Sequence, residues 1–349
     1  MWSSMGNNRN ETAGTISAVF HCPETAGPPL EALFAREPFA VTDGALATEL
    51  ERAGFAIDDP LWSALALMEA PERIYEVHRS YLEAGADIIT TASYQGTIPG
   101  FMKKGCTRTE AVHLLRLSVA IARKARDDYE AETGRHALVA ASVGPYGAYL
   151  ADGSEYRGQY GLTRAELTAF HRERLAILME AGPDLLACET LPCLMEVEAL
   201  ADCLAPYPPG CAWLSFSCAD GCHTCGGDDA GDCAAFVDGV PQIAAAGVNC
   251  TAPAHVAPLL ARMHRRTEKP LIAYPNSGEV YDTARRCWTG APVDFTALLP
   301  QWLAAGARLV GGCCRTTPET VRRLAAAREA WKSDKLKNKD VPSGSVFFY

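Results

Sequence analysis

Eight short apolar segments, each followed by a helical pattern, predict an α/β protein folded as a (β/α)8 TIM barrel in a single domain. The apolar segments do not alternate with polar residues, which is typical of parallel strands covered on both faces. Eight such units in one chain of 349 residues fit a closed barrel. An open doubly wound sheet is the alternative, and it explains the even number of units less well.

The expected strands share a short apolar core between segments with helical hydrophobic spacing. They are Phe39–Asp43, Asp87–Thr91, Ala137–Ser142, Asp184–Cys188, Ala212–Ser217, Gly247–Asn249, Pro270–Tyr274 and Arg308–Gly311. Helix starts are marked by two capping boxes, Thr107 with Glu110 and Thr163 with Glu166. Pro71 occupies a plausible first helical position, and Pro318 does the same near the C-terminus.

An Ala-Gly unit recurs before every second strand, at Gly85, Gly182, Gly247 and Gly306. In each case we expect a helix to end with glycine as its C′ residue and a strand to follow at once. The spacing suggests a doubled two-strand repeat.

The two ends of the chain differ in composition from its body. Residues 1–30 are polar, rich in small residues and closed by Gly27-Pro28-Pro29, which predicts a flexible N-terminal extension. Residues 332–349 are lysine-rich and then contain Pro342-Ser343-Gly344-Ser345, which predicts a flexible C-terminal tail. Residues 31–331 are therefore expected to form the barrel.

Composition restricts the partners and the setting. The 32 basic and 42 acidic residues give a formal net charge of −10, which argues against nucleic acid or a membrane surface as partner and suits a cationic substrate. No signal peptide and no apolar stretch of membrane-spanning length is visible. Several of the 14 cysteines end apolar runs, where a disulfide scaffold would not usually place them. We therefore expect free thiols and a cytoplasmic location.

The chemically most informative stretch is Gly311-Gly312-Cys313-Cys314, which follows the last predicted strand. Adjacent cysteines rarely bridge each other, but two thiolates on one loop suit a soft metal such as zinc. Cys250 ends the sixth strand and is the third candidate ligand. Three cysteines leave one position of a tetrahedral zinc ion open, as catalytic sites do. The sequence therefore predicts one Zn²⁺ per chain, bound by Cys250, Cys313 and Cys314, in an enzyme that places its substrate on the metal.

The remaining cysteines carry less information. Cys188, Cys203, Cys211 and Cys287 are interpreted as small buried hydrophobic residues. A further group surrounds His223 and contains a Cys-x-x-Cys spacing without the second pair of a zinc knuckle. Its members are Cys218, Cys222, Cys225 and Cys233, which are best interpreted as incidental free thiols, with a second metal site as the alternative.

Other polar residues also fall at strand ends, where the reactive groups of a barrel belong. Asp43 ends the first strand, Glu189 the fourth and Asn249 the sixth, while Tyr94 follows the second and Tyr146 the third. The carboxylates could instead cap the helices that follow them, and the tyrosines could be ordinary packing residues. Their joint placement on one rim favours a substrate pocket.

With these residues placed, the sequence resembles the homocysteine S-methyltransferase family from about Phe39 to about Arg328. The long stretch after the third strand is most similar to the branch that uses S-methylmethionine, not the betaine-using branch. The stretches that carry the resemblance are Thr42–Ala45, Thr91–Gln95, Ser142–Tyr156, Cys188–Thr190, Val248–Cys250, Tyr274–Glu279 and Gly311–Thr316.

The resemblance implies a (β/α)8 barrel, zinc ligands at Cys250, Cys313 and Cys314, and a homocysteine amino group near Asp43 and Glu189. It implies methyl transfer from a sulfonium donor to the thiol of homocysteine, which forms methionine. The sulfonium should lie over an aromatic face, with Tyr94 and Tyr146 as candidates. We expect S-methylmethionine as donor, S-adenosylmethionine as a slower second and betaine as inactive. The enzyme is expected to be a monomer or a small homo-oligomer.

Two alternatives remain open at this point. Another thiol or selenol acceptor, such as selenocysteine, would need only small changes in the same fold. A non-catalytic zinc-binding barrel would explain the cysteines, but it has no need of Asp43, Glu189 and Asn249. A cobalamin-linked methionine synthase is disfavoured, because no cobalamin or folate module fits in this length.

Overall fold

The computed structural model describes residues 27–282 and 287–339, and its eight parallel strands close into a barrel. The strands follow one another in the order β1-β10-β7-β6-β5-β4-β3-β2. A parallel bridge between Thr42 and Ile88 joins the first strand to the second, and the Asp43 N–H donates to the Ile88 carbonyl at 3.0 Å. The predicted (β/α)8 TIM barrel is thereby confirmed.

All eight predicted strands are present, with boundaries shifted by a few residues. They are β1 (Ala40–Val41), β2 (Ile88–Thr90), β3 (Leu138–Val143), β4 (Leu185–Leu191), β5 (Ala212–Phe216), β6 (Ile243–Asn249), β7 (Leu271–Tyr274) and β10 (Ala307–Val310). A two-stranded antiparallel hairpin, β8 (Val280–Asp282) with β9 (Cys287–Thr289), follows β7 and was not predicted.

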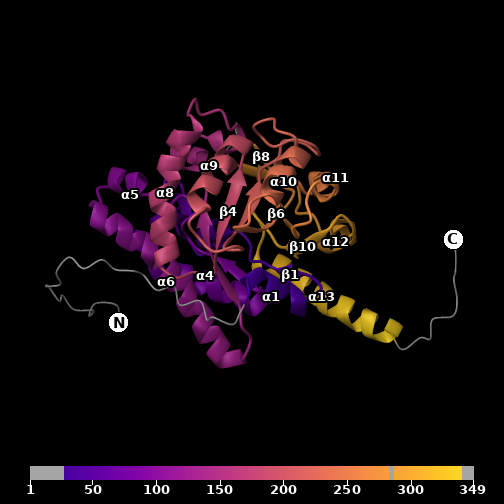
Figure 1. Cartoon of the computed structure of the whole chain (residues 1–349). Coiled ribbons are helices and arrows are strands. Elements are labelled where there is room, and N and C mark those ends of the chain that lie inside the picture. The colour runs from indigo at the N-terminus through magenta and orange to yellow at the C-terminus, as the bar shows by residue number, and fades with distance from the viewer. Residues whose placement is uncertain (1–26, 283–286, 340–349) are drawn as a thin grey trace.

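Helices surround the barrel on its outer side (Figure 1). They are α1 (Pro29–Arg36), α2 (Leu46–Arg52), α3 (Ala66–Glu69), α4 (Pro71–Ala84), α5 (Ile98–Lys103), α6 (Arg108–Thr133), α7 (Tyr146–Leu150), α8 (Arg164–Glu180), α9 (Leu194–Leu204), α10 (Ala230–Asp238), α11 (Pro253–His264), α12 (Phe295–Ala304) and α13 (Pro318–Lys339). Two short 3-10 helices, Trp62–Leu65 and Ser154–Tyr156, lie in the connections after β1 and β3.

The local signals for helix ends are confirmed at most positions. Both capping boxes form at the starts of α6 and α8, and Pro71 opens α4 as Pro318 opens α13. The prediction for Gly247 is wrong, because this glycine lies inside β6 and ends no helix. A Cβ at Gly247 would overlap the Ile272 carbonyl oxygen of the neighbouring β7, so glycine is needed here for close strand approach and not for a helix cap.

Side chains of the strands alternate between two apolar layers, which explains why the strands have no polar face. In β3, Leu138 and Ala140 point into the barrel, whereas Val139 and Ala141 pack against the outer helices. Trp213 is the largest side chain in the interior, where it is fully buried. Leu30 and Leu33 of α1 join the same interior cluster. The barrel is therefore a packed core that carries its chemistry at one end.

The predicted boundaries of the barrel, at residues 31 and 331, both fall within helices. Helix α1 already begins at Pro29, and α13 continues to Lys339 and extends away from the barrel (Figure 1). Residues 332–339 are thus helical, which their lysines and leucine favour, although they were assigned to a flexible tail. The rest of the two predicted extensions, residues 1–26 and 340–349, lies outside the described residues.

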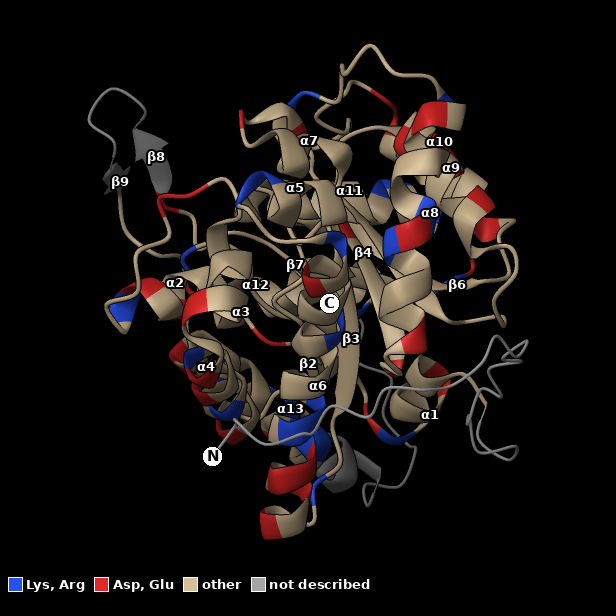
Figure 2. Cartoon of the chain, turned by 90° about the vertical axis from the view of Figure 1, so that its left-hand side faces the viewer, with Lys and Arg blue, Asp and Glu red and all other residues tan. Residues whose placement is uncertain are grey.

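The outer surface carries both signs of charge. In Figure 2, Lys and Arg are interspersed with Asp and Glu along α4, α8 and α13. Many of these groups pair across neighbouring helices, as Arg164 of α8 does with Asp202 of α9 at 2.7 Å. Within the described part of the chain, no helix is both long and apolar enough to cross a bilayer.

We predict that Gly247→Ala lowers the free energy of unfolding by about 1–3 kcal/mol, because the new methyl group forces β6 away from the Ile272 carbonyl. Urea denaturation measures the change. Gly239→Ala is the matched control, since its Cβ would meet only Phe236 O at 3.6 Å and its φ is −75°. Equal stability of the two variants would contradict this account of the β6–β7 contact.

Candidate active site

A cavity of about 730 Å³ opens at the carboxyl end of the barrel strands. It brings together seven of the eight side chains singled out from the sequence. These are Asp43, Tyr94, Glu189, Asn249, Cys250, Cys313 and Cys314. The remaining one, Tyr146, is not among the residues that line it.

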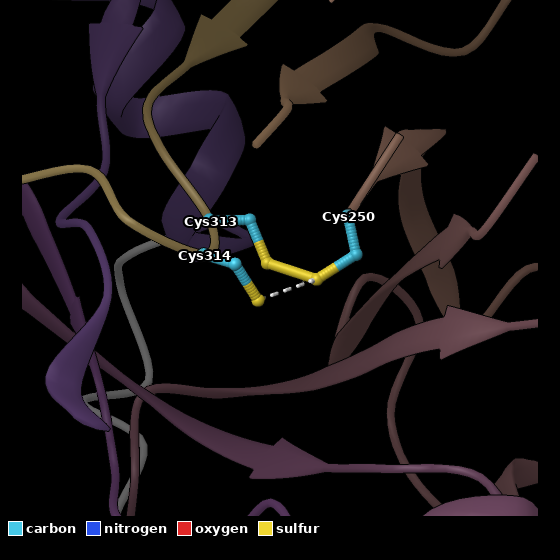
Figure 3. A group of neighbouring side chains, drawn as sticks. All are labelled: Cys250, Cys313 and Cys314. Carbon is cyan, nitrogen blue, oxygen red and sulfur yellow. Dashed lines mark hydrogen bonds between the residues drawn. A yellow bond between two sulfur atoms is a disulfide. The ribbon is translucent and has the colours of Figure 1, made fainter. Parts of the chain in front are cut away.

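The three cysteines form one cluster (Figure 3), in which all Sγ atoms lie within 4.8 Å of one another. Cys250 follows β6, and Cys313 and Cys314 follow β10. Among the described residues, this is the group of metal-ligating side chains that is close enough to hold an ion. Cys218, Cys222, Cys225 and Cys233 are free cysteines outside it.

Cys250 and Cys313 are joined by a disulfide, and the Cys314 sulfur lies 3.8 Å from that of Cys250 (Figure 3). This corrects the prediction that all three are free thiols. The same closeness that suits metal binding also permits a disulfide, because the two Cα atoms are 5.4 Å apart. The structure therefore shows an oxidised form of the cluster, and a two-electron reduction would give three thiols at the same place.

The backbone around the cluster is constrained to bring the two loops together. Cys250 adopts a left-handed conformation with φ 45°, which is costly for a residue with a Cβ. A Cβ at Gly311 would overlap Thr42, and one at Gly312 would overlap Thr316, so both glycines allow close approach. The Cys313 N–H donates to the Pro275 carbonyl at 2.8 Å, which ties this loop to the end of β7.

Asn249 is fully buried next to the cysteine cluster. Its side-chain oxygen accepts from the Thr190 N–H and from the Ser215 hydroxyl, each at 2.8 Å. Its amide nitrogen donates to the Thr190 hydroxyl at 2.8 Å and faces the Cys313 sulfur at 3.9 Å. Asn249 is thus held by β4 and β5 and is better placed to orient a cysteine than to contact a substrate directly.

Asp43 and Glu189 are buried carboxyl groups at the base of the cavity. Asp43 accepts from the Thr90 N–H at 2.7 Å, and the Ser142 hydroxyl donates to Glu189. Burial raises the pKa of Asp43 to about 7 in spite of the Thr90 hydrogen bonds, and the charge of Glu189 adds to the effect. Burial likewise raises the pKa of Glu189 to about 7 against the lowering effect of Ser142. A cation placed between them would stabilise both charged forms.

Tyr94 and Tyr146 have different surroundings. Tyr94 lines the cavity, and the edge of its ring faces Trp62, with the ring centroids 6.1 Å apart. Tyr146 instead packs its ring against Phe170 and Tyr160, at centroid distances of 4.9 and 5.4 Å. The prediction that Tyr146 contacts substrate is therefore not supported by its position. Residues 146–150 form helix α7, which turns this side chain into an aromatic cluster.

Two cavity residues were missed as site candidates, although they lie within the stretch that carries the family resemblance. Glu155 and Tyr156 sit in the connection after β3, well beyond the end of the strand, and both line the cavity. Burial raises the pKa of the Cys314 thiol to about 11, and a hydrogen bond from the neighbouring Tyr156 hydroxyl opposes this rise. The expectation that reactive residues lie at strand ends does not reach this far along a loop, so the sequence did not point to either residue.

Comparison with known proteins agrees with this geometry. The family model described as homocysteine S-methyltransferase matches residues 40–328. The chain belongs to the homocysteine S-methyltransferase family. The match covers the whole barrel together with the cavity and all three clustered cysteines.

Relatives within this family are similar over nearly their whole length. The chain is 48% identical to homocysteine S-methyltransferase YbgG of Bacillus subtilis over 312 residues, which is 87% of this chain and 99% of that one. It is 49% identical to homocysteine S-methyltransferase of Escherichia coli over 303 residues, covering 85% and 98%.

Solved structures of the homocysteine methyltransferase MmuM from E. coli superpose on the barrel. The metallated form matches with a TM-score of 0.78 and 47% identity, over 85% of this chain and 99% of that one. The oxidised form matches with a TM-score of 0.79 and 48% identity, over 86% and 99%.

We predict that the metal-free protein loses stability as the pH rises from 5 to 7, and that Asp43→Asn reduces this loss by about 2 kcal/mol. The folded protein keeps a proton on Asp43 up to about pH 7, whereas the unfolded chain releases it near pH 4. Stability is therefore greatest below the unfolded pKa and declines until the folded pKa is reached.

Urea denaturation at the two pH values measures this difference. Asp58→Asn, at an exposed position, is the control and should leave the pH dependence as in the wild type. An unchanged loss of stability in Asp43→Asn would show that this carboxyl is not kept protonated in the folded state.

Proposed function

We propose that this enzyme transfers a methyl group from S-methylmethionine to the thiol of homocysteine on a zinc ion held by Cys250, Cys313 and Cys314. Family membership supports the reaction class and homocysteine as acceptor. The observation that carries the proposal is the cluster of three sulfurs in the same cavity as two buried carboxyl groups. A non-catalytic zinc-binding barrel would not need those carboxyl groups.

The donor set fits zinc. Three soft sulfur ligands favour Zn²⁺ and leave one tetrahedral position for a substrate atom. The cluster must first be reduced, because the sulfurs of a disulfide are not thiolate ligands. Once reduced, buried thiols such as Cys314, with its pKa of about 11, need a nearby cation to become thiolates. When bound, zinc supplies the positive charge that keeps the homocysteine sulfur deprotonated at neutral pH.

The homocysteine head group is assigned to Asp43 and Glu189. Its ammonium ion would pair with two carboxyl groups that burial otherwise disfavours in charged form. Removing either partner of such a buried pair costs about 2–5 kcal/mol of binding. Neither carboxyl group is given a proton-transfer role, since methyl transfer between sulfurs needs no general acid. Asn249 orients Cys313 and so acts through the cysteine cluster.

The charge of the cavity supports a cationic donor. Five carboxyl groups line it, and no Lys, Arg or His is found among its described lining residues; the acidic ones are Asp43, Asp59, Glu155, Glu189 and Glu279. S-methylmethionine carries a net positive charge, whereas betaine is neutral overall. Trp62 and Tyr94 offer aromatic faces for the sulfonium. The cavity volume also leaves room for S-adenosylmethionine as a second donor.

The transfer itself is a displacement at carbon. The bond between the donor sulfur and its methyl group breaks, and the electron pair stays on that sulfur, which becomes a neutral thioether. The homocysteine thiolate forms the new bond to the methyl carbon, so both products are methionine. The protein contributes by holding the two sulfurs and the methyl group in line, at near-attack distance.

Two further assignments belong to this proposal. Selenocysteine and related selenols remain alternative acceptors, because a selenolate could take the position of the thiolate. The cytoplasm is the proposed location, since ten cysteines in the described part of the chain are free, which suits a reducing compartment.

A methionine-formation assay with reduced, zinc-loaded enzyme and homocysteine tests the function. We expect the highest kcat/KM with S-methylmethionine, a lower value with S-adenosylmethionine and no turnover with betaine. Chelation of the metal should abolish activity, and added zinc should restore it.

Two results would contradict the proposal. Equal rates with betaine would show that the donor is assigned wrongly. Full activity after complete metal removal would exclude the zinc-bound thiolate. Selenocysteine as acceptor is tested in the same assay, with S-methylmethionine as the fixed donor.

A further inference from the structure

Four of the five cavity carboxyl groups are engaged with other side chains. Asp43 is bonded to Thr90 and Glu189 to Ser142, as described above. Asp59 pairs with Lys104, and Glu279 accepts from the Ser277 hydroxyl at 2.9 Å. Glu155 differs, because its Oε2 atom is buried and accepts no hydrogen bond from the protein. A buried carboxylate oxygen without a partner is costly unless a ligand supplies one.

The segment that carries Glu155 is firmly tied to the barrel. The Ser217 hydroxyl, at the end of β5, donates to the Glu155 carbonyl at 3.0 Å. Within the segment, the Ser154 N–H donates to Asp152 at 2.9 Å. A Cβ at Gly147 would overlap the Glu155 N–H, so glycine lets α7 pack directly against this turn. The position of Glu155 in the cavity is thus set by several contacts and is not that of a loosely held surface side chain.

Glu155 lies at the part of the cavity next to the cysteine cluster. The next residue, Tyr156, adjoins the Cys314 sulfur and keeps 43% of its surface exposed, although it lines the cavity. Tyr94 is a neighbour of both residues. Glu155 therefore lines the same cavity as Tyr94, Tyr156 and Cys314, one of the residues that would hold the metal ion.

The reaction brings two amino acids into one cavity, and each carries an ammonium group. Asp43 and Glu189 account for one of them. Glu155 lies in the 3-10 helix after β3, whereas Asp43 follows β1 and Glu189 lies in β4. Burial raises the pKa of Glu155, and a bound cation would stabilise the charged form of this carboxyl group. A second, separate anionic position is therefore present for the second ammonium.

We propose that Glu155 binds the α-ammonium group of the methyl donor, which makes it the residue that restricts donors to sulfonium compounds carrying an amino group. This inference rests on the proposed function, because it assumes a sulfonium donor. Tyr94 and Tyr156 would then flank the sulfonium while Glu155 holds the head group. Sulfonium compounds without the amino group would lose this contact and leave the buried carboxylate unpaired.

The test compares S-methylmethionine with 4-(dimethylsulfonio)butanoate, which has the same carbon chain, sulfonium and carboxylate but no ammonium. In Glu155→Gln we expect kcat/KM for S-methylmethionine to fall by about 30-fold or more. For the analogue it should change by less than about threefold. The KM for homocysteine and the zinc content should stay at the wild-type values. Equilibrium binding of S-methylmethionine to the zinc-loaded enzyme should weaken by a similar factor.

Asp152→Asn is the matched control, because it removes a negative charge from the same segment while its side-chain oxygen can still accept from the Ser154 N–H. It should behave as the wild type with both donors. Two results in Glu155→Gln would overturn the assignment of Glu155. One is an equal loss of kcat/KM with both donors, and the other is a change confined to a higher KM for homocysteine. Failure of the wild type to use S-methylmethionine would instead overturn the proposed function.

Discussion

The close approach of the ends of β6 and β10 is the constraint on which the rest of the site depends. β7 lies between these strands and bonds to both of them, so Cys250 and the Cys313-Cys314 pair reach the cavity from either side of it. The small residues Gly247, Gly311 and Gly312 allow this spacing, because a side chain at any of them would overlap a neighbour. The left-handed backbone of Cys250 then turns its sulfur toward the other two. Three sulfurs within 4.8 Å can form a disulfide or share a metal ion, depending on the redox state.

Electrostatics explains why such a site favours positively charged ligands. Cysteine sulfurs and carboxyl groups are buried together, and burial raises the pKa values of Asp43, Glu189 and Cys314. A metal ion on one side and ammonium groups on the other would each relieve part of this cost. The same excess of negative groups would then favour three things: binding of the metal ion, deprotonation of the acceptor thiol by that ion, and selection of a cationic donor.

Much of the fold could be predicted from the sequence because the barrel strands are buried on both faces and stand out as apolar runs. The cluster of three cysteines could also be predicted, since residues at the carboxyl ends of strands converge in a barrel. Gly247 was wrongly predicted to end a helix, because the sequence Ala-Ala-Gly can occur before a strand or within one. The prediction that Tyr146 lies in the pocket is not supported because nothing in the sequence indicates that α7 turns this side chain toward Phe170. Glu155 was not predicted because its proposed role is inferred from a buried carboxylate oxygen that has no hydrogen-bond partner in the protein. Only the three-dimensional contacts reveal this.

The central claim is that the homocysteine thiol completes the coordination of a zinc ion held by Cys250, Cys313 and Cys314. Zinc X-ray absorption spectroscopy on the reduced enzyme tests it most directly. We expect three sulfur neighbours at about 2.3 Å without substrate and a fourth at the same distance after homocysteine is added. In Cys314→Ser each count should fall by one. A sulfur count that stays the same when homocysteine binds to the active enzyme would contradict the claim.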